Sequence, residues 1–459
     1  MKSFLQRVLP AVFGHNTDRK GARDATPDHR QSPVVAPSPE ALTASAPQAV
    51  AGARRLLIAS SGEVIGFEFR IPDYTLLRLK RRSDPRAQAA HVTAVMASAR
   101  LITQSGRTGL ARVPAEWLVY VTALDTAPGA MVALEVSEAP SREVMAAMVE
   151  VVQQLRAHGA KVGWSDALIL PLQSDFVVVH QGEESMATVL KRIEAWPDHL
   201  RGRPTLVTDM ANVEGIELAL ASGITYVCGA LAPQPGGINQ KDALPVSPEL
   251  KRVGHLLNQL VTGAETEVII SQIKGDVGLS YRLLRRINSA SFAQLGAGAT
   301  IDQAVLMLGR NELYRWLSVL LVQFAGSRKA SSALQEVALW RSRLLELLAI
   351  ERREDIPGQF FTLGLASMLG LLLKMNPADV VSTLNLPEPA QQALLAQTGP
   401  WHSYLQVAVL VESQLLEDAG ALTDQFGGVE RVLALSDEAW AWAAQHTDKA
   451  ARGEAPKIA

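Results

Sequence analysis

Arginines dominate the residues whose spacing could support chemistry in this chain. Arg282, Arg285 and Arg286 lie close together in the sequence, and Arg310 and Arg315 follow nearby. A cluster of guanidinium groups can bind the phosphates of a nucleotide or of a nucleic acid. The same spacing is also typical of the solvent-exposed face of a helix, because charged side chains are seldom buried. The sequence favours the solvent-exposed helix face over a phosphate-binding site.

Residues that commonly bind metals are scarce and scattered. The nine histidines include no adjacent His-Asp pair, and His255 and His402 stand alone in predicted helices. Cys228 is the only cysteine, which excludes an intrachain disulfide and a cysteine-rich zinc site and fits a reducing cytoplasm. We therefore expect no metal and no other cofactor.

Length and charge limit the possible classes of protein. The chain has 459 residues, so about two to three domains are expected. A formal net charge of -2 gives no overall attraction to nucleic acid or to an anionic membrane. No uninterrupted apolar run reaches about 18 residues, the length that a membrane span needs. We predict a cytoplasmic protein that does not depend on nucleic acid.

Two helices joined by a polar loop can be recognised in residues 274–310. The first helix has an apolar face, formed by Leu279, Leu283, Leu284 and Ile287. Asp276 suits the start of this helix, since a carboxylate is favoured at a helix N-terminus. Thr300 and Gln303 have the spacing of a capping box, and the apolar pattern of the second helix ends at Gly309.

This segment resembles a known family. The order of its residues resembles the first half of the HDOD domain, the all-helical HD-related output domain of bacterial signalling proteins: Gly275-Asp276, Leu279, Leu283-Leu284, Asn288-Ser289-Ala290, Thr300-Ile301, Gln303-Ala304-Val305 and Leu308-Gly309. The resemblance implies an all-helical domain at 249–446 that lacks hydrolase chemistry. Catalytic HD enzymes carry a metal-binding His-Asp pair where this chain has Ser367-Met368.

The remaining sequence of this region is consistent with helices throughout. Further helices are expected at Glu249–Val261, Glu265–Ile273, Glu312–Phe324, Ala333–Glu351, Phe360–Lys374, Pro377–Leu384, Pro387–Ala396, Tyr404–Glu417 and Asp437–Gln445. Trp440 and Trp442 are two residues apart on the last of these, so their side chains diverge by roughly 200 degrees. One of the two could therefore contact a partner.

Short apolar runs alternate with amphipathic stretches before this region. Strands are expected at Leu56–Ala59, Val64–Ile71, Leu118–Thr122, Val132–Val136, Lys161–Trp164, Phe176–Val179, Thr205–Thr208 and Thr225–Cys228. Helices are expected at His91–Gln104, Ser141–His158, Glu184–Ala195 and Val213–Ser222. This alternation predicts a parallel α/β barrel of the TIM type, whose functional residues would lie at the carboxyl ends of the strands.

The barrel region resembles the EAL domain, which is the barrel of cyclic di-GMP phosphodiesterases. The signature glutamate stands as Glu68 in the segment 66–70, and a strand-end glutamate stands as Glu135 in the segment 134–138. The resemblance implies Glu68, Glu135, Asp166 and Asp209 as residual candidates for binding a metal ion. The alternative is that these carboxylates cap helices or pair with arginines.

Several other positions depart from the active EAL pattern. Active members carry a metal-binding asparagine, a pair of aspartates, a catalytic lysine and a closing glutamine where this chain has Thr122, Ser165-Asp166, Val178 and Cys228. Hydrolysis of a phosphodiester with two metal ions needs enough oxygen ligands to hold both ions. The resemblance therefore implies a degenerate EAL domain without catalytic residues, although cyclic di-GMP could still bind without turnover.

We predict a multidomain chain in which a degenerate EAL barrel precedes an all-helical HDOD domain. The expected order is a disordered leader at 1–50, the barrel at 51–235, a linker rich in proline and glycine at 236–248, the HDOD domain at 249–446 and a flexible tail at 447–459.

The predicted function is that of a non-catalytic signalling regulator or scaffold. The resemblance implies protein contacts linked to cyclic di-GMP-related motility or biofilm control. Candidate partner-binding residues are Asn288, Ser289, Arg282, Arg285 and Arg286, although the loop that begins at Asn288 could equally be an internal elbow. The alternative function is a cyclic di-GMP receptor or weak phosphodiesterase that uses the residual carboxylates.

Overall fold

The computed structural model describes residues 54–135, 141–165, 172–231, 248–287, 300–323, 329–384, 386–413 and 420–452. The predicted leader and nearly all of the predicted linker lie outside the described residues, so the domain boundaries stay predictions. We call residues 54–231 the barrel region and residues 248–452 the helical region. In the described part of the chain, no helix is long and apolar enough to cross a membrane.

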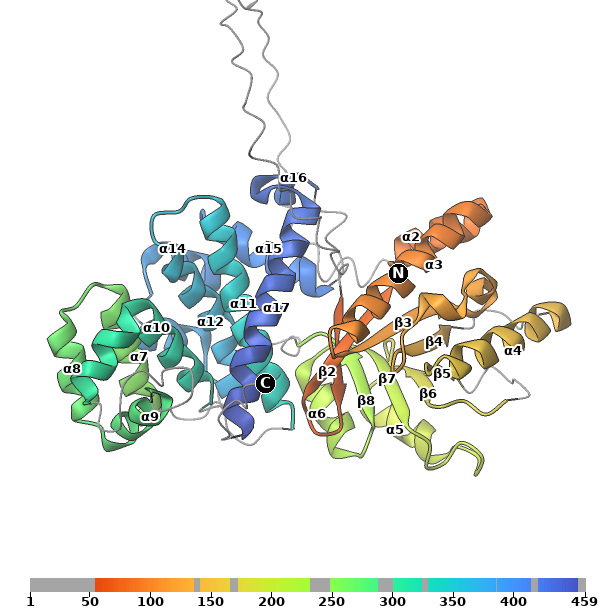
Figure 1. Cartoon of the computed structure of the whole chain (residues 1–459), viewed down its shortest axis with the longest axis horizontal. Helices are drawn as coiled ribbons and strands as arrows, with labels where there is room; N and C mark the ends of the chain where they lie inside the picture. Colours follow the sequence, from red (N-terminus) through yellow and green to blue (C-terminus); the bar gives the residue numbers. More distant parts are fainter. Residues whose placement is uncertain are drawn as a thin grey trace, which may run out of the picture. The chain divides into compact units, whose positions relative to one another are not determined.

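Eight strands close into a barrel in sequence order, as predicted for this region (Figure 1). They are β1 (Arg55–Ala59), β2 (Val64–Arg70), β3 (Thr108–Pro114), β4 (Met131–Glu135), β5 (Lys161–Trp164), β6 (Val177–His180), β7 (Thr205–Met210) and β8 (Tyr226–Gly229). Neighbouring strands from β2 to β8 are parallel. The carboxyl ends of these strands therefore meet at one mouth of the barrel.

Strand β1 departs from the predicted parallel arrangement because it is antiparallel to both β2 and β8. A tight turn joins β1 to β2, and Gly62 in this turn has a φ of +84°, a conformation that glycine adopts without steric cost. A parallel connection would need a crossover of a dozen or more residues. The β1–β2 hairpin consequently has no barrel helix between its strands.

The predicted strand at Leu118–Thr122 was wrong. Residues Ala115–Tyr120 form a 3-10 helix, η2, and the third strand is β3, at Thr108–Pro114. Trp117, Leu118 and Val121 are buried, and a short apolar run cannot be assigned to strand or helix from its pattern alone. Gly109 and Pro114 made the true strand resemble a loop.

Helices and short turns surround the barrel strands. The helices are α2 (Asp73–Arg82), α3 (Pro85–Gln104), α4 (Arg142–Ala157), α5 (Met186–Glu194) and α6 (Val213–Ala221), with a second 3-10 turn, η3, at Ala123–Asp125. Helix α3 begins earlier than predicted because the Asp84 carboxylate accepts hydrogen bonds from the backbone N–H groups of Arg86 and Ala87.

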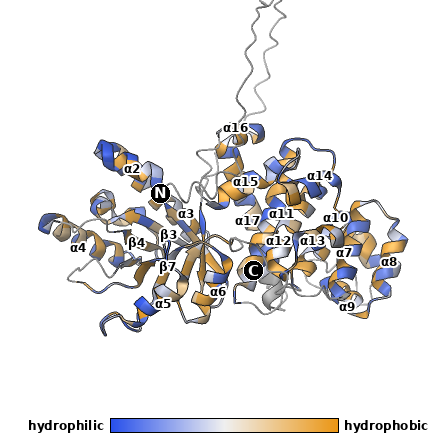
Figure 2. Cartoon of the chain, turned by 180° about the vertical axis from the view of Figure 1, so that it is seen from behind, coloured by the Kyte–Doolittle hydropathy of each residue, from blue (hydrophilic) through white to orange (hydrophobic). Residues whose placement is uncertain are grey.

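The helical region contains no strand among its described residues. Its elements are α7 (Pro248–Val261), α8 (Thr266–Lys274), α9 (Val277–Ile287), α10 (Ile301–Gln323), α11 (Ser331–Glu351), α12 (Pro357–Leu373), α13 (Pro377–Leu384), α14 (Glu388–Gln391), the π-helical η5 (Gln392–Ala396), α15 (His402–Ser413), α16 (Gly420–Thr423), η7 (Asp424–Phe426) and α17 (Val429–Arg452). Every predicted helix of this region overlaps one of them. Helix α12 is buried over most of its circumference, and its residues are mostly hydrophobic (Figure 2).

The local signals that delimit α9 and α10 are confirmed. The Asp276 carboxylate accepts a hydrogen bond of 3.0 Å from the backbone N–H of Leu279. Thr300 and Gln303 form the expected capping box, with hydrogen bonds of 2.9 and 3.3 Å. Gly309 interrupts the helical dihedrals inside α10, with φ 68° and ψ 168°, so the chain turns where the apolar pattern predicted an end.

Two sets of buried residues make up the core. The inward side chains of the barrel form a separate cluster, which contains Leu57, Leu110, Met131, Ala133, Phe176, Val178, Leu206 and Cys228. A larger cluster runs from the outer faces of the strands through the interior of the helical region. Residues Val50–Ala459 accordingly form one compact unit.

The dihedrals of Gly309 lead to a stability prediction. Gly309→Ala places a side chain at a φ and ψ that only glycine adopts readily, so we expect the free energy of unfolding to fall by about 1–3 kcal/mol. Urea denaturation would measure this change. Gly358→Ala in the first turn of α12, where a Cβ meets no atom within 4 Å, is the control and should leave stability unchanged or slightly higher. Equal stabilities for the two variants would contradict the prediction.

Candidate functional site

Three carboxylates converge on one arginine at the mouth of the barrel. Glu68 comes from β2, Arg112 from β3, Glu135 from the end of β4 and Asp209 from β7. The side chains of Arg112 and Glu68 are 3% and 0% exposed. We call these four residues the Arg112 cluster.

The Arg112 guanidinium bonds to every carboxylate of the cluster. Its Nη1 donates to Glu68 Oε1 at 2.8 Å, and its Nε donates to Glu135 Oε1 at 2.9 Å. Its Nη1 and Nη2 also donate to the two Asp209 oxygens at 3.2 and 3.1 Å. A buried guanidinium needs such partners, because an unpaired charge in the interior is very costly.

Further basic groups surround Asp209. Arg55 Nη1 donates to Asp209 Oδ1 at 2.7 Å, and Arg70 Nη1 lies 3.6 Å from the same oxygen. His180 at the end of β6 has its Nδ1 3.3 Å from Asp209 Oδ2 and 2.8 Å from the Thr208 hydroxyl. The positive charges near the mouth are therefore already paired within the protein.

The backbone at Asp209 is unusual for a residue with a side chain. Its φ is +61°, and the register between β7 and β8 shifts between Val207 and Met210. Left-handed conformations are uncommon outside glycine and cost of order 1 kcal/mol or more. The surrounding bonds to Arg55 and Arg112 offset this cost and hold the carboxylate at the centre of the mouth.

The surroundings of Arg112, Glu135 and Asp209 shift their pKa values in the direction that favours the charged forms. Burial acts to lower the pKa of Arg112, but Glu68, Glu135 and Asp209 together raise it above its usual range. Burial acts to raise the pKa of Glu135, but Arg112 and His180 outweigh it and leave the pKa below its usual value. Burial likewise opposes ionisation of Asp209, yet the hydrogen bond from His180 and the charge of Arg112 lower its pKa strongly.

The cluster does not fit the divalent metal ions that the EAL resemblance implies. The Arg112 guanidinium occupies the space between the carboxylates and uses their oxygens as hydrogen-bond acceptors. Nowhere in the described ranges do three or more histidine, cysteine, aspartate or glutamate side chains form a group that could hold a metal ion. The positive charge between these carboxylates is therefore the guanidinium of Arg112, which is part of the chain itself.

The other positions taken from the EAL pattern are not members of this cluster, and one of them lies outside the described residues. Thr122 does not belong to β3, and its backbone N–H and hydroxyl bond to Asp125. Assigning Thr122 to the asparagine position was therefore wrong, and Arg112 is the β3 residue that meets the carboxylates. Val178 and Cys228 are buried in the interior cluster. Asp166 lies outside the described residues.

Sequence reasoning missed Arg112 and His180. Arg112 lies in a strand that was not among the predicted strands, although a lone arginine within the apolar run 110–113 was a usable signal. His180 directly follows the apolar run 177–179, which places it at a strand end. Correct assignment of strands β3 and β6 would have placed both residues at the mouth.

A second buried arginine lies at the HD-like position of the helical region. Arg341 on α11 donates through Nη2 to both oxygens of Glu412, at 2.6 and 2.7 Å. Its Nη1 donates to the Ser367 hydroxyl at 3.1 Å, and Ser367 belongs to the Ser367-Met368 pair that the family resemblance aligns with the His-Asp pair of HD enzymes. An ion pair thus joins α11, α12 and α15 at this position.

The arginines of α9 and α10 have different surroundings. Arg282 is exposed and Arg286 is partly buried, and burial lowers the pKa of Arg286 while Glu312 partly opposes this shift. Arg310 donates to the backbone carbonyls of Ala264 and Leu260, at 2.6 and 2.9 Å. The side chain of Arg285, together with Asn288 and Ser289, lies outside the described residues.

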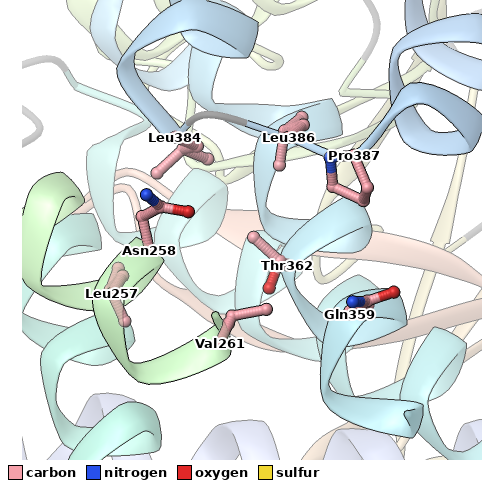
Figure 3. Close-up of a pocket in the computed structure, with 8 residues that line it drawn as sticks. All are labelled: Leu257, Asn258, Val261, Gln359, Thr362, Leu384, Leu386 and Pro387. Carbon is pink, nitrogen blue, oxygen red and sulfur yellow. The ribbon is translucent and has the colours of Figure 1, made fainter. Parts of the chain in front are cut away.

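A small cavity lies within the helical region. Side chains of α7, α12 and α13 line it together with Leu386 and Pro387 (Figure 3). Its volume of about 20 Å³ is room for about one water molecule. Pockets for ligands of nucleotide size usually have volumes of about 300–1,000 Å³, so this cavity is no candidate for binding a cyclic dinucleotide.

Comparisons with known proteins found one family match, within the helical region. The HDOD domain family matches residues 248–394. A relative named Uncharacterized protein YuxH, from Bacillus subtilis, is 30% identical over 160 residues, which are 34% of this chain and 39% of that protein. Cyclic di-GMP phosphodiesterase CdgJ, from Vibrio cholerae, is 27% identical over 191 residues, which are 40% of this chain and 43% of that protein. The chain matches less than half the length of either relative.

Two solved structures also show some similarity. An EAL domain protein from Listeria monocytogenes has a TM-score of 0.29 and 12% identity, and the match covers 38% of this chain and 84% of that chain. A putative signal transduction protein from Marinobacter aquaeolei has a TM-score of 0.33 and 13% identity, with 59% and 90% covered.

Removal of the central cation should destabilise the protein strongly. Arg112→Met leaves the buried Glu68 and the partly buried Glu135 without their guanidinium partner and removes one of the cations around Asp209, so we expect the free energy of unfolding to fall by about 3–5 kcal/mol at about pH 7. Urea denaturation would measure this difference. Lys80→Met removes a half-exposed ion pair with Glu116 and should cost about 1 kcal/mol or less. Similar losses in both variants would contradict the central role of Arg112.

The loss of stability in Arg112→Met should depend on pH, because the pKa values of Glu135 and Asp209 are lowered in the folded wild type. A carboxylate with a lowered folded-state pKa stabilises the fold fully above its unfolded pKa of about 4, and this contribution is lost as the pH falls through the folded pKa. In Arg112→Met, repulsion between the carboxylates should instead raise their pKa values. We expect the difference in unfolding free energy between wild type and variant to shrink from about pH 7 to about pH 4. A constant difference over this range would contradict the electrostatic explanation.

Proposed function

Since the HDOD match and the closed barrel support the EAL-HDOD family of cyclic di-GMP-related signalling proteins, we propose that this chain is a non-catalytic regulator. It acts through protein contacts, and neither region hydrolyses a phosphodiester. The process that it regulates is motility or biofilm formation linked to cyclic di-GMP.

The main support for this proposal is the geometry of the Arg112 cluster. Two-metal hydrolysis requires carboxylate oxygens that are available to divalent ions. In this chain one buried guanidinium donates hydrogen bonds to Oε1 of Glu68, to Oε1 of Glu135 and to both oxygens of Asp209. An arginine neutralises the carboxylates, but it cannot activate water as a metal ion does.

The helical region gives independent support. Metal-dependent HD chemistry needs imidazole and carboxylate ligands at the position of Ser367. The Ser367 hydroxyl accepts a hydrogen bond from Arg341, which Glu412 holds through both oxygens. Both regions contain an arginine whose charge is paired with carboxylates, at positions where the family resemblance led us to expect metal ligands in catalytic members.

We place the partner-binding surface on α9 and the loop that follows it. Val277 and Tyr281 are spaced by one turn of α9 and are 84% and 65% exposed, and Arg282 adjoins Tyr281. Exposed tyrosine and arginine are frequent among the residues that dominate protein interfaces. Asn288, Ser289 and Arg285 belong to the same proposed surface.

A second candidate function is a cyclic di-GMP receptor or weak phosphodiesterase. The observation in its favour is the similarity to a relative whose name describes it as a cyclic di-GMP phosphodiesterase. A nucleotide phosphate at the barrel mouth would have to compete with Asp209 for Arg55 and Arg70. Such competition favours weak binding without turnover.

Calorimetric titration would separate these functions. Cyclic di-GMP is titrated into the full-length protein with Mg²⁺ and then with Ca²⁺, and the same samples are analysed for linear product. We expect no product above a control without protein. Binding heat without product would identify a receptor, whereas product that disappears in Glu135→Ala would contradict the non-catalytic proposal.

Replacing Arg112 with a residue that can bind a metal tests whether its guanidinium occupies the place of a metal ion. Arg112→Asn removes the guanidinium and leaves the three carboxylates around the vacated space, so Mn²⁺ should raise the melting temperature of this variant. A ligand at about 100 times its Kd stabilises a fold by about 2.7 kcal/mol. Wild type and Arg112→Lys, which both keep a cation, should not respond. Equal responses of all three proteins would contradict the proposal.

A further inference from the structure

Neighbouring residues of the β1–β2 hairpin face two different parts of the protein. Arg55 lies opposite Glu68 in the antiparallel ladder, and Leu56 lies opposite Phe67. Arg55 and Glu68 bond to Asp209 and Arg112 at the barrel mouth. Because side chains alternate between the two faces of a strand, Leu56 and Phe67 point to the outside of the barrel.

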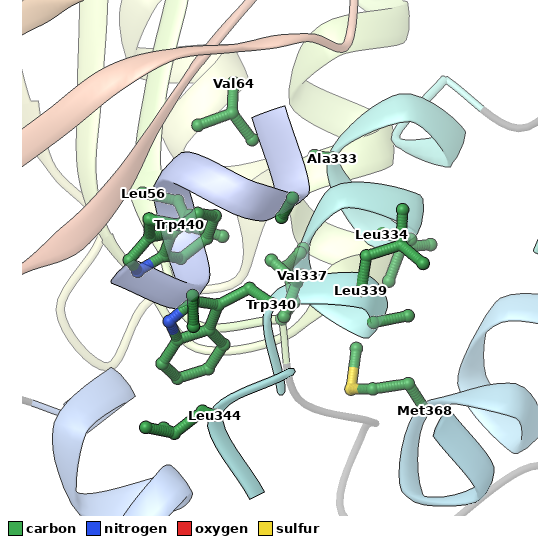
Figure 4. Packing of buried hydrophobic residues seen from close by; sticks show 14 of the residues in the cluster. Leu56, Val64, Ala333, Leu334, Val337, Leu339, Trp340, Leu344, Met368 and Trp440 are labelled. Carbon is green, nitrogen blue, oxygen red and sulfur yellow. The ribbon is translucent and has the colours of Figure 1, made fainter. Parts of the chain in front are cut away.

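The outer face of the hairpin packs against α11 and α17. Phe67 meets Trp440 of α17 edge-on, with 4.8 Å between the ring centroids. Trp440 stacks on Trp340 of α11 at 5.0 Å, and Trp340 Nε1 donates to the Ser436 hydroxyl at 3.3 Å. Leu56, Trp440 and Trp340 lie together in Figure 4. Trp440 is thus the member of the Trp440 and Trp442 pair that contacts the barrel.

Two ion pairs flank this aromatic contact. Arg54, immediately before β1, pairs with Asp437 of α17, and its side chain is 5% exposed. Arg107, immediately before β3, pairs with Glu336 of α11, whose side chain is 7% exposed. Both guanidinium groups also lie near the ring of Phe67, at 4.8 and 5.5 Å from its centroid. The barrel side of the contact is cationic and the helical side is anionic.

The turn of the hairpin completes the contact. The Gly62 carbonyl accepts a hydrogen bond of 3.1 Å from the backbone N–H of Ala333, at the start of α11. A Cβ at Gly62 would lie 1.8 Å from the carbonyl oxygen of Lys329, so a larger residue would separate the two backbones. Helices α11 and α17 thus cover the hairpin, whose own connection contains no barrel helix.

We propose that the β1–β2 hairpin couples the Arg112 cluster to helices α11 and α17, so that a change on one side of the hairpin alters the stability of the other. The inference goes beyond the proposed function, since it requires neither a ligand nor a partner. Arg54 and Arg55, like Phe67 and Glu68, are adjacent residues that contact opposite sides. The backbone cannot shift toward one side without disturbing packed contacts on the other, and such coupling must be reciprocal.

Cys228 provides a reporter within the barrel. It is the only cysteine of the chain, it is buried, and it lies opposite Leu57 of β1 in the β1–β8 ladder. A thiol reagent reaches it only when the barrel opens, so the labelling rate measures the stability of the hairpin region.

The test compares Cys228 labelling in full-length variants of the helical region. Asp437→Asn and Trp440→Leu weaken the contact with the hairpin, and both should accelerate labelling by about tenfold or more. Gly309→Ala is the control, because it strains α10 without touching the hairpin. Because Gly309→Ala lowers stability without changing the hairpin contact, it should accelerate labelling less than either interface variant when the rates are compared at an equal loss of unfolding free energy.

Two results would overturn the inference. Wild-type labelling rates in both interface variants would show that the barrel does not depend on α11 and α17. Equal acceleration by Gly309→Ala would show general loss of stability with no role for the hairpin.

Hydrogen exchange tests the reciprocal direction. Arg112→Met in the barrel should increase exchange of the backbone amides of α11 and α17, compared with Lys80→Met. This comparison does not use Trp440→Leu, so it tests the coupling even if that variant fails to fold. Identical exchange of these helices in the two variants would contradict the coupling.

Discussion

The buried charge of Arg112 is the constraint on which the barrel mouth depends. A guanidinium with 3% of its side chain exposed can be accommodated only if acceptors surround it, because the interior does not replace hydration. Glu68, Glu135 and Asp209 provide those acceptors from three different strands. The same bonds connect β2, β3, β4 and β7. Charges that would destabilise the fold if they were unpaired therefore hold these strand ends in place.

This arrangement explains how three carboxylates can lie close together at the mouth of the barrel. Carboxylates at the ends of parallel strands repel one another unless a cation lies between them. A metal ion would meet this need in an EAL phosphodiesterase, and Arg112 meets it here with a charge that cannot dissociate. The bond between Arg341 and Glu412 in the helical region follows the same principle, since a fixed ion pair stands at the HD-like position.

The hairpin of β1 and β2 links these two parts of the molecule. Its inner face contributes Arg55 and Glu68 to the mouth, while its outer face presents Phe67 to Trp440. Antiparallel β1 leaves the connection between the two strands too short for a helix, and α11 and α17 cover the exposed side. The barrel and helical regions therefore share one hydrophobic core and are best understood as a single unit.

The sequence by itself determined the order of the two regions, most of the strands and the ends of α9 and α10, because hydrophobic periodicity, capping residues and Gly309 act locally. It also identified Glu68, Glu135 and Asp209 through a family resemblance. Only the tertiary structure decided that β3 lies at Thr108–Pro114 and that Arg112 binds all three carboxylates. The physical reason is that strand pairing and buried charge pairing join residues that are distant in the sequence, and no local pattern specifies which strand will bring a cation to the acids.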